Sequence, residues 1–140
     1  MAESVIRGRV EDYAKAISAK DIDRIASFFA RDLVSFDIAI NALRYVGADN
    51  KGREWQKAFA VYSSIVYEVH DLRVATHGEL AFVHAVNHVK GTLASGQVTD
   101  LWVRWTACFR RIDGIWLIVH DHVSVPVDFE RGQALLNLEP

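Results

Sequence analysis

Two aspartates stand where a carboxylate could carry out acid–base chemistry. Asp37 lies between Phe36 and Ile38 in a short segment that reads as a strand. In such an apolar setting the charged form of a carboxylate is disfavoured, which would make Asp37 a stronger proton acceptor. Asp121 lies inside the run 119–123, and if it points inward it is a second acid for the same site. The alternatives are backbone donors or an arginine as partners of Asp37, and a salt bridge to an arginine of another strand for Asp121.

Four histidines fall at positions that could bind a metal ion. His120 and His122 alternate along one strand, so both project from one face, and His84 and His88 lie on a neighbouring strand. Together with Asp100, such a set could bind zinc. Histidines that hydrogen-bond across a sheet or a subunit contact are the more common arrangement. We therefore expect no metal ion and no cofactor.

The bulk composition bounds the class of protein. The chain has 140 residues, of which 51% are hydrophobic and 24% charged, as expected for one domain (1–140) with a substantial core. The net charge is -2, whereas proteins that bind nucleic acid usually carry a basic patch, so no nucleic-acid partner is expected. The single cysteine, Cys108, allows no internal disulfide, and with no recognisable leader we expect a cytoplasmic protein. No apolar run approaches the ~20 residues that span a membrane, so no membrane partner is expected.

Periodicity then indicates the elements that position these residues. The Asp113–Gly114 step between two runs rich in Val, Ile, Trp and Phe is the strongest hairpin signal in the chain. Apolar residues at helical spacing predict three helices, and the remaining runs predict five strands. The expected helices span 4–19, 22–30 and 53–64, with a strand over 33–40, a loop over 41–52, strands over 65–76 and 79–90, two hairpin strands within 99–126, and a loose tail over 127–140.

This order favours an α+β fold, because the helices gather before four consecutive strands that short turns can join into an antiparallel meander. The helices can cover only one face of the sheet. The other face still carries large apolar side chains, namely Phe82, Val86, Trp102, Trp116 and Ile118. A contact between subunits is the simplest way to bury them, so we expect a homodimer formed through the sheet.

The hairpin also carries a family resemblance. The run FRRIDGIW at 109–116, followed by VHDHVS at 119–124, resembles the nuclear transport factor 2-like superfamily. The similarity covers Val5 to Asp128 and is greatest to the SnoaL-like branch, which includes ketosteroid isomerase and the association domain of calcium/calmodulin-dependent protein kinase. It implies a cone-shaped fold, with three N-terminal helices wrapped on a strongly curved antiparallel sheet, a pocket inside the cone and a dimer through the outer face. The superfamily includes both enzymes and assembly modules, so fold alone does not fix function.

The resemblance to ketosteroid isomerase also implies roles for particular residues. Asp37 matches that enzyme's general base and Tyr13 its oxyanion donor. The second oxyanion donor of the isomerase is an acid on the strand before the last. The matching positions, 105–107, hold no acid, so this part of the resemblance fails.

The kinase association domain implies which strand faces point inward. Its pocket arginines match Asn87, Ala107 and Val123, none of which is arginine, so an arginine-lined anion pocket is not expected. The inward set would include Asn87, Trp105 and Asp121. The even-numbered set, with Arg104 and the four histidines, would face outward unless a bulge reverses it locally.

These observations together give two hypotheses of function. In the first, the pocket binds a small, mostly apolar organic molecule such as a cyclic or polyketide-like ketone, with a cofactor-free isomerase, cyclase or dehydratase activity that works by proton transfer. The expected catalytic residues are Asp37, Tyr13 and Asp121, and the expected substrate-binding residues are Trp55, Phe59, Tyr62, Asn87 and Trp105. Aromatic residues at helical spacing more often belong to a core, and in the second hypothesis the chain is a non-catalytic dimerisation or association module.

Overall fold

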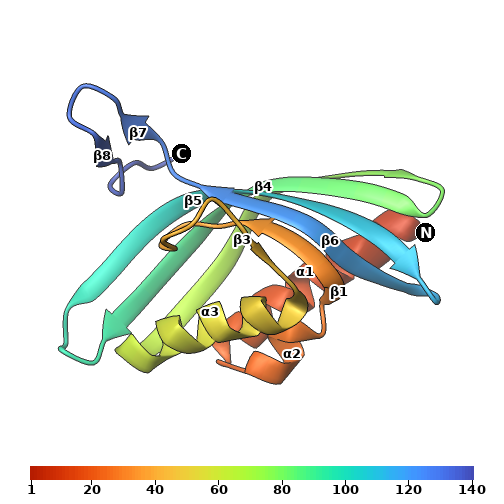
Figure 1. The fold of residues 1–140 in the computed structure, drawn as a ribbon, viewed down its shortest axis with the longest axis horizontal. Coiled ribbons are helices and arrows are strands. Elements are labelled where there is room, and N and C mark those ends of the chain that lie inside the picture. The colour runs from red at the N-terminus through yellow and green to blue at the C-terminus, as the bar shows by residue number, and fades with distance from the viewer.

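Eleven elements make up the chain, for which a computed structural model describes all residues 1–140. The three helices precede or interrupt the first strands, and a run of long strands follows (Figure 1). In chain order the elements are α1 (Ala2–Ser18), α2 (Ile22–Ala26), β1 (Phe29–Phe36), β2 (Tyr45–Val46), α3 (Ala48–Val61), β3 (Tyr62–His77), β4 (Leu80–Leu93), β5 (Val98–Ile112), β6 (Ile115–Ser124), β7 (Val127–Asp128) and β8 (Gln133–Ala134).

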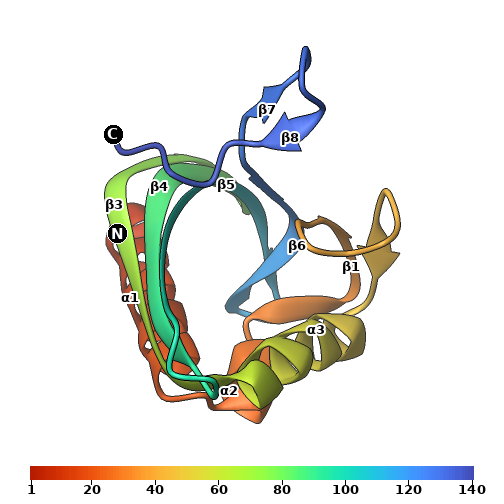
Figure 2. The ribbon, with the colours of Figure 1, turned by 90° about the vertical axis from the view of Figure 1, so that its left-hand side faces the viewer.

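Six strands form one sheet in the order β2-β1-β6-β5-β4-β3. Every neighbouring pair is antiparallel except β1 and β6, which are parallel. Figure 2 shows the strands bent into an arch whose open side is crossed by α2 and α3. The predicted α+β class with a strongly curved sheet is confirmed. The predicted hairpin is confirmed too, because Asp113 (φ 51°) and Gly114 (φ 81°) both take the positive φ values that its turn requires.

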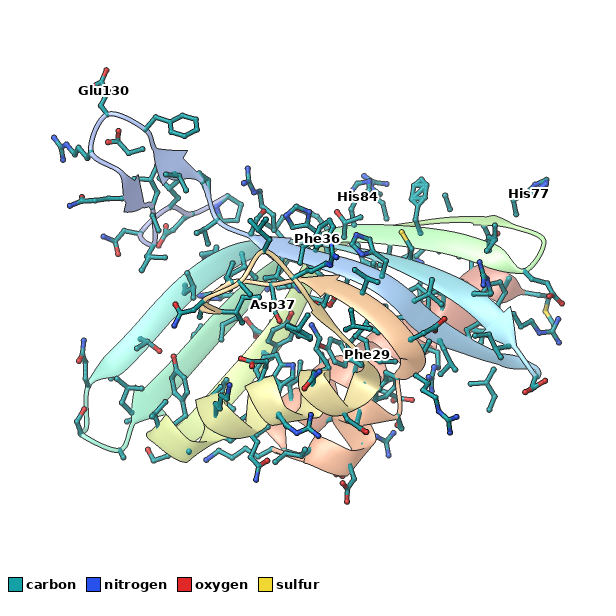
Figure 3. All side chains as sticks on the ribbon, viewed as in Figure 1. Phe29, Phe36, Asp37, His77, His84 and Glu130 are labelled. Carbon is teal, nitrogen blue, oxygen red and sulfur yellow. The ribbon has the colours of Figure 1, made fainter.

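The concave face of the sheet holds the core. The apolar face of α1 packs against this sheet through Ile6, Val10 and Ile17, all of which are buried. Asn87, Trp105 and Asp121, expected to point inward, are closed to solvent. Figure 3 shows Phe29 and Asp37 on the helix side of the sheet and His84 on the opposite, convex side.

A β-bulge in β6 overturns one part of the expected outer face. Phe109 pairs with Ile118 and Cys108 with His120, so Val119 is the extra residue and the faces exchange there. Trp116 and Ile118 therefore belong to the buried core, whereas His120 and His122 stay on the convex side. The remaining outer apolar residues are Phe82, Val86 and Trp102.

Several predicted boundaries were wrong, among them the end of the third helix, which lies at Val61 and not at 64. The second helix ends at Ala26, not at 30, because residues 28–30 are buried beside β6 and the carbonyl of Phe28 accepts the Ile118 N–H. The first strand accordingly spans Phe29–Phe36 and leaves Asp37 just beyond its end. The third helix begins at Ala48, within the predicted loop, after Gly47 (φ 99°).

The tail carries the short β7–β8 pair, which extends away from the arch (Figure 1). No helix is long and apolar enough to cross a membrane.

Candidate functional site

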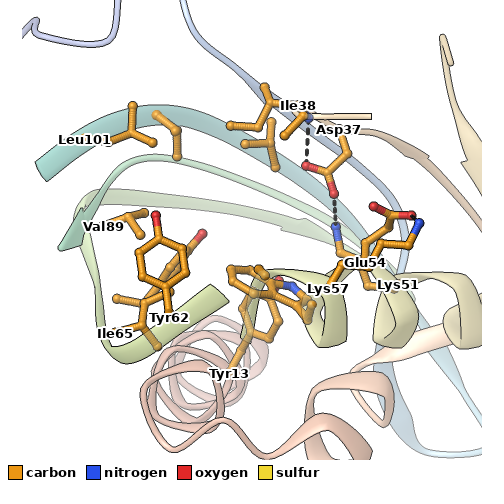
Figure 4. Close-up of a pocket in the computed structure, with 16 residues that line it drawn as sticks. Tyr13, Asp37, Ile38, Lys51, Glu54, Lys57, Tyr62, Ile65, Val89 and Leu101 are labelled. Atoms are coloured by element: carbon orange, nitrogen blue, oxygen red, sulfur yellow. Dashed lines mark hydrogen bonds and ion pairs between the residues drawn. The ribbon is translucent and has the colours of Figure 1, made fainter. Parts of the chain in front are cut away.

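A cavity of about 370 Å³ lies between α3 and the concave face of the sheet (Figure 4). Most of its walls are apolar, with side chains from α1, α3 and strands β3 to β6. Its polar groups are confined to a few side chains, which are Tyr13, Asp37, Lys51, Glu54, Lys57, Tyr62 and Tyr67. An apolar cavity with a few polar anchors is the usual form of a small-molecule site.

The most unusual of these groups is Lys51, in the first turns of α3. Its side chain is only 2% exposed, which is rare for lysine. The helix α3 begins at Ala48 and therefore includes both Lys51 and Trp55. The two residues are one helical turn apart, so both lie on the face that points into the arch. The next residue, Gly52, packs against α2, since a Cβ there would lie 3.5 Å from the side chain of Ile22.

Lys51 joins two carboxylates. Its Nζ atom lies 2.8 Å from Oδ2 of Asp121 and 3.3 Å from Oδ2 of Asp37, and it lies 3.4 Å from the hydroxyl of Ser35. Ser35 in turn donates to Oδ1 of Asp121 at 2.5 Å. All three ammonium protons therefore have acceptors, and Lys51 acts as a fixed positive charge rather than a free amine.

Asp37 is the member of this cluster that meets the cavity. Its Oδ1 accepts the N–H of Ile38 at 2.9 Å, and its Oδ2 accepts the hydroxyl of Tyr45 at 2.7 Å as well as Lys51. The setting is therefore charged and hydrogen-bonded, not apolar as the flanking residues suggested. The carboxylate is 16% exposed, whereas that of Asp121 is fully buried, so an incoming molecule can reach only Asp37.

Burial and charge act in opposite directions on the ammonium. Burial by itself lowers the pKa of Lys51, but the carboxylates of Asp121 and Asp37 outweigh it, and the pKa of Lys51 lies well above its usual value. Burial raises the pKa values of Tyr13, Tyr45 and Tyr67. The phenols therefore keep their protons at neutral pH and can act as hydrogen-bond donors.

Two of these phenols form an aromatic wall of the cavity. Tyr13 stacks on Trp105 at 5.8 Å between ring centroids and meets Tyr67 edge to face at 6.2 Å. The hydroxyl of Tyr67 accepts the amide N–H of Asn87 at 2.6 Å. Its own proton is not used in that bond and remains available to a molecule in the cavity.

The structure divides the residues predicted from sequence into two layers. Four of them line the cavity, which are Tyr13, Asp37, Trp55 and Tyr62. The other four lie one layer behind. Asp121 reaches the cavity only through Lys51, Asn87 only through Tyr67, and Trp105 supports Tyr13. Phe59 stacks on Trp55 at 5.5 Å.

Sequence reasoning missed Lys51, Ser35, Tyr45 and Tyr67. A signal for Lys51 did exist, because it continues the spacing of Trp55, Ala58 and Tyr62 at 51, 55, 58 and 62. The signal was lost when 41–52 was interpreted as a loop. Tyr45 and Ser35 carry no such signal, since only the pairing of β1 with β2 and β6 brings them to Asp37 and Asp121.

This arrangement suits proton transfer. It offers an accessible carboxylate held by a buried cation, with neutral phenols among the other residues that line the cavity. The two aspartates do not form a metal site, because the ammonium of Lys51 already occupies the position between them that a cation would take.

Comparisons with known proteins identify the family and the fold. No curated protein matches the chain. A protein of unknown function with the nuclear transport factor 2-like fold, from Pseudomonas putida KT2440, is 33% identical over 99% of this chain and 96% of its own, with a TM-score of 0.87.

Two more distant structures share the fold. A proposed scytalone dehydratase from Novosphingobium aromaticivorans is 12% identical over 88% of this chain and 83% of its own, with a TM-score of 0.78. A hexachlorocyclohexane dehydrochlorinase is 15% identical over 99% and 91%, with a TM-score of 0.79. The SnoaL-like domain matches residues 6–128. The chain therefore belongs to the SnoaL-like domain family, within the nuclear transport factor 2-like fold.

Proposed function

We propose that the cavity binds a small, mostly apolar organic molecule with a carbonyl group and that Asp37 removes a proton from it. The observation that supports this most is the difference in access between the two carboxylates that Lys51 joins, since only Asp37 opens into the cavity. A cavity of about 370 Å³ is large enough for a cyclic ketone of one or two rings.

In the proposed reaction Asp37 accepts a proton from the carbon next to the carbonyl, and the electron pair of that C–H bond moves onto the carbonyl oxygen. Tyr13, with Tyr67 beside it, donates a hydrogen bond to the developing oxyanion. Asn87 acts indirectly, because its amide fixes the hydroxyl of Tyr67. The proton then returns to another carbon in an isomerisation, or the pair of electrons expels a leaving group in an elimination.

Lys51 and Asp121 act as positioning residues in this scheme. Asp121 holds the ammonium of Lys51 at 2.8 Å, and this fixed ammonium lies 3.3 Å from the carboxylate of Asp37. The bond from Tyr45 fixes the carboxylate in one orientation. A positioned base of this kind typically contributes a factor of about 10²–10⁴ in rate.

The names of two fold relatives favour the same class of reaction. Dehydration and dehydrochlorination are both eliminations, in which a base removes a proton as a leaving group departs. Because these relatives are distant, the isomerase, cyclase and dehydratase forms of the proposal all remain candidates.

The test combines binding with proton exchange. A thermal-shift screen against steroids, aromatic polyketides and short carboxylates should show a concentration-dependent rise in melting temperature for cyclic ketones. Each ligand found is then incubated with the protein in D₂O, and deuterium uptake next to the carbonyl is measured by mass spectrometry. Asp37→Asn should bind the ligand and lose the exchange, while Asp32→Asn, which removes an exposed acid of β1, should keep it. Undiminished exchange in Asp37→Asn would show that Asp37 is not the base.

The second candidate is an association module, which the convex face favours. Phe36 and Phe82 there are 38% and 46% exposed, and Trp102 lies further along the same face on β5, opposite His88. We propose a homodimer through this face, as is common for the fold. Trp102→Glu should halve the mass measured by light scattering. If Trp102→Glu loses the dimer but still binds the ligand, the enzyme hypothesis is supported. If no compound in the screen binds and the wild type is a stable dimer, the association module is supported.

A further inference from the structure

A second cluster of chemically capable side chains lies on the convex face, across the sheet from the cavity. Glu68 and His70 project from the same face of β3, and Glu68 pairs directly with His88 of β4. The register therefore brings two imidazoles and one carboxylate together. This cluster differs from the four histidines that strand alternation alone places on one face. In the structure His84 pairs with Thr106, and His120 hydrogen-bonds to the Val34 carbonyl.

The distances within this cluster match a metal site. Oε1 of Glu68 lies 3.4 Å from Nε2 of His70 and 3.4 Å from Nδ1 of His88. All three atoms lie within 4.8 Å of one another. Zinc bonds of about 2.0–2.1 Å in a tetrahedral arrangement require ligand atoms about 3.3–3.4 Å apart. The two distances from Glu68 already have this length. A small rotation of the exposed His70 ring would shorten the third distance, between the nitrogens of His70 and His88, to the same value.

The orientation of His88 is fixed in the way that metal-binding histidines usually are. Its Nε2 lies 2.6 Å from a carboxylate oxygen of Asp100, on the side of the ring away from the cluster. Its ring stacks on Trp102 at 4.2 Å and 6°. A carboxylate on the second nitrogen sets the tautomer, so that Nδ1 presents its lone pair toward Glu68 and His70. This contact is the feature that distinguishes the cluster from a chance group of surface charges.

We propose that Glu68, His70 and His88 bind a divalent transition-metal ion, for which Zn²⁺ is the probe. Two imidazole nitrogens and one carboxylate oxygen suit zinc and leave a fourth position to water. In the single chain Glu68 and His70 are exposed, so the ion can enter from solvent, while His88 is nearly buried and anchors the site. Asp100 is a positioning residue. The site is independent of the proposed proton transfer, because the sheet separates the two.

The experiment is a calorimetric titration of chelator-treated protein with Zn²⁺. The wild type should bind one ion per chain, and His88→Ala should lower the affinity at least tenfold. Glu68→Gln, which keeps the shape of the side chain, should do the same. His84→Ala is the matched control, since it removes a histidine from the same strand and face without touching the cluster, and it should bind as the wild type does.

The role of Asp100 needs a separate readout. Asp100→Asn should lower the affinity about 10–100-fold, as loss of an orienting carboxylate does. With Co²⁺ in place of Zn²⁺, the visible absorption spectrum of the Asp100→Asn variant should keep the wild-type shape, because the three ligands are unchanged. The spectrum of the His88→Ala variant should change. Unaltered melting curves of the metal-free variants would show that they fold. No binding at stoichiometric Zn²⁺, or equal losses in His84→Ala and His88→Ala, would overturn the proposal.

Discussion

The ammonium of Lys51 lies 2.8 Å from the carboxylate of Asp121, and both side chains are closed to solvent. Removing two charges from water is costly, and only close contact and further hydrogen bonds compensate for it. Ser35 supplies one such bond to Asp121, and Asp37 supplies a second partner to Lys51. The buried pair thus fixes a charge at the cavity wall and leaves Asp37 as the one carboxylate of this cluster that solvent and ligands can reach.

Lys51→Met should destabilise the fold strongly. The variant leaves the buried Asp121 without its cation, and breaking one side of such a pair costs about 3–5 kcal/mol. Urea unfolding at neutral pH measures the loss. The double variant Lys51→Met/Asp121→Asn is the control, and it should recover a large part of the stability because no buried charge remains. A loss of less than about 1 kcal/mol in the single variant would contradict this account of the pair.

Sequence patterns located the fold better than the site. The Asp113–Gly114 turn, the consecutive long strands and the apolar stripe of α1 are local signals, and each was confirmed. Lys51 and Tyr45 depend on where α3 begins and on how a two-residue strand pairs with β1. Lys51 continues the helical spacing of α3 and was missed because the start of that helix was misplaced, whereas the pairing of β2 with β1 leaves no periodic trace, so Tyr45 could not be identified from the chain.

The bulge in β6 shows a second limit. Strict alternation assigns Trp116 and Ile118 to the same face as His120, but one extra residue at Val119 places them on opposite faces. A bulge carries no reliable sequence signal, and it reverses every side chain beyond it. Asp121 and His122 therefore face as predicted, while the start of the same strand does not.

Tyr67→Phe should cost about 1–3 kcal/mol, because it removes the only partner of the buried Asn87 amide. The other polar atom of that amide, Oδ1, already has no hydrogen-bond partner, so the variant would leave the whole group unsatisfied. Urea unfolding checks the value. The double variant Tyr67→Phe/Asn87→Leu should recover most of the loss, since it buries no polar group, and a double variant as unstable as the single one would refute the explanation.

Two glycine substitutions should have opposite effects. A Cβ at Gly91 would collide with the ring of Tyr62 and lie 3.0 Å from the Ser64 carbonyl, so Gly91→Ala must displace a residue that lines the cavity. We expect a loss of about 1–3 kcal/mol. Gly8 lies in α1 with open space around it, so Gly8→Ala should gain about 0.5–1 kcal/mol from helix propensity. Thermal unfolding of both variants measures the contrast, and equal shifts would contradict the packing argument.

Stability should fall as the pH rises above about 10, where tyrosine and lysine side chains of the unfolded chain begin to lose protons. The pKa values of Tyr45, Tyr67 and Lys51 are all raised on folding, so the folded state keeps these protons to higher pH. Below about pH 10 both states hold them, and the stabilisation is fully present. Above it the unfolded state binds fewer protons than the folded state, and each group lowers the unfolding free energy by about 1.4 kcal/mol per pH unit.

Tyr45→Phe separates this titration from the hydrogen bond that the same phenol makes. Near pH 8 the variant should lose about 1 kcal/mol, because Asp37 no longer accepts the Tyr45 hydroxyl. Above about pH 10 its unfolding free energy should fall less steeply than that of the wild type, by about 1.4 kcal/mol per pH unit, because one titrating group is gone. Urea unfolding across this range gives both quantities. A parallel pair of curves would show that the phenol does not contribute to the alkaline loss, since a hydrogen bond alone shifts the curve without changing its slope.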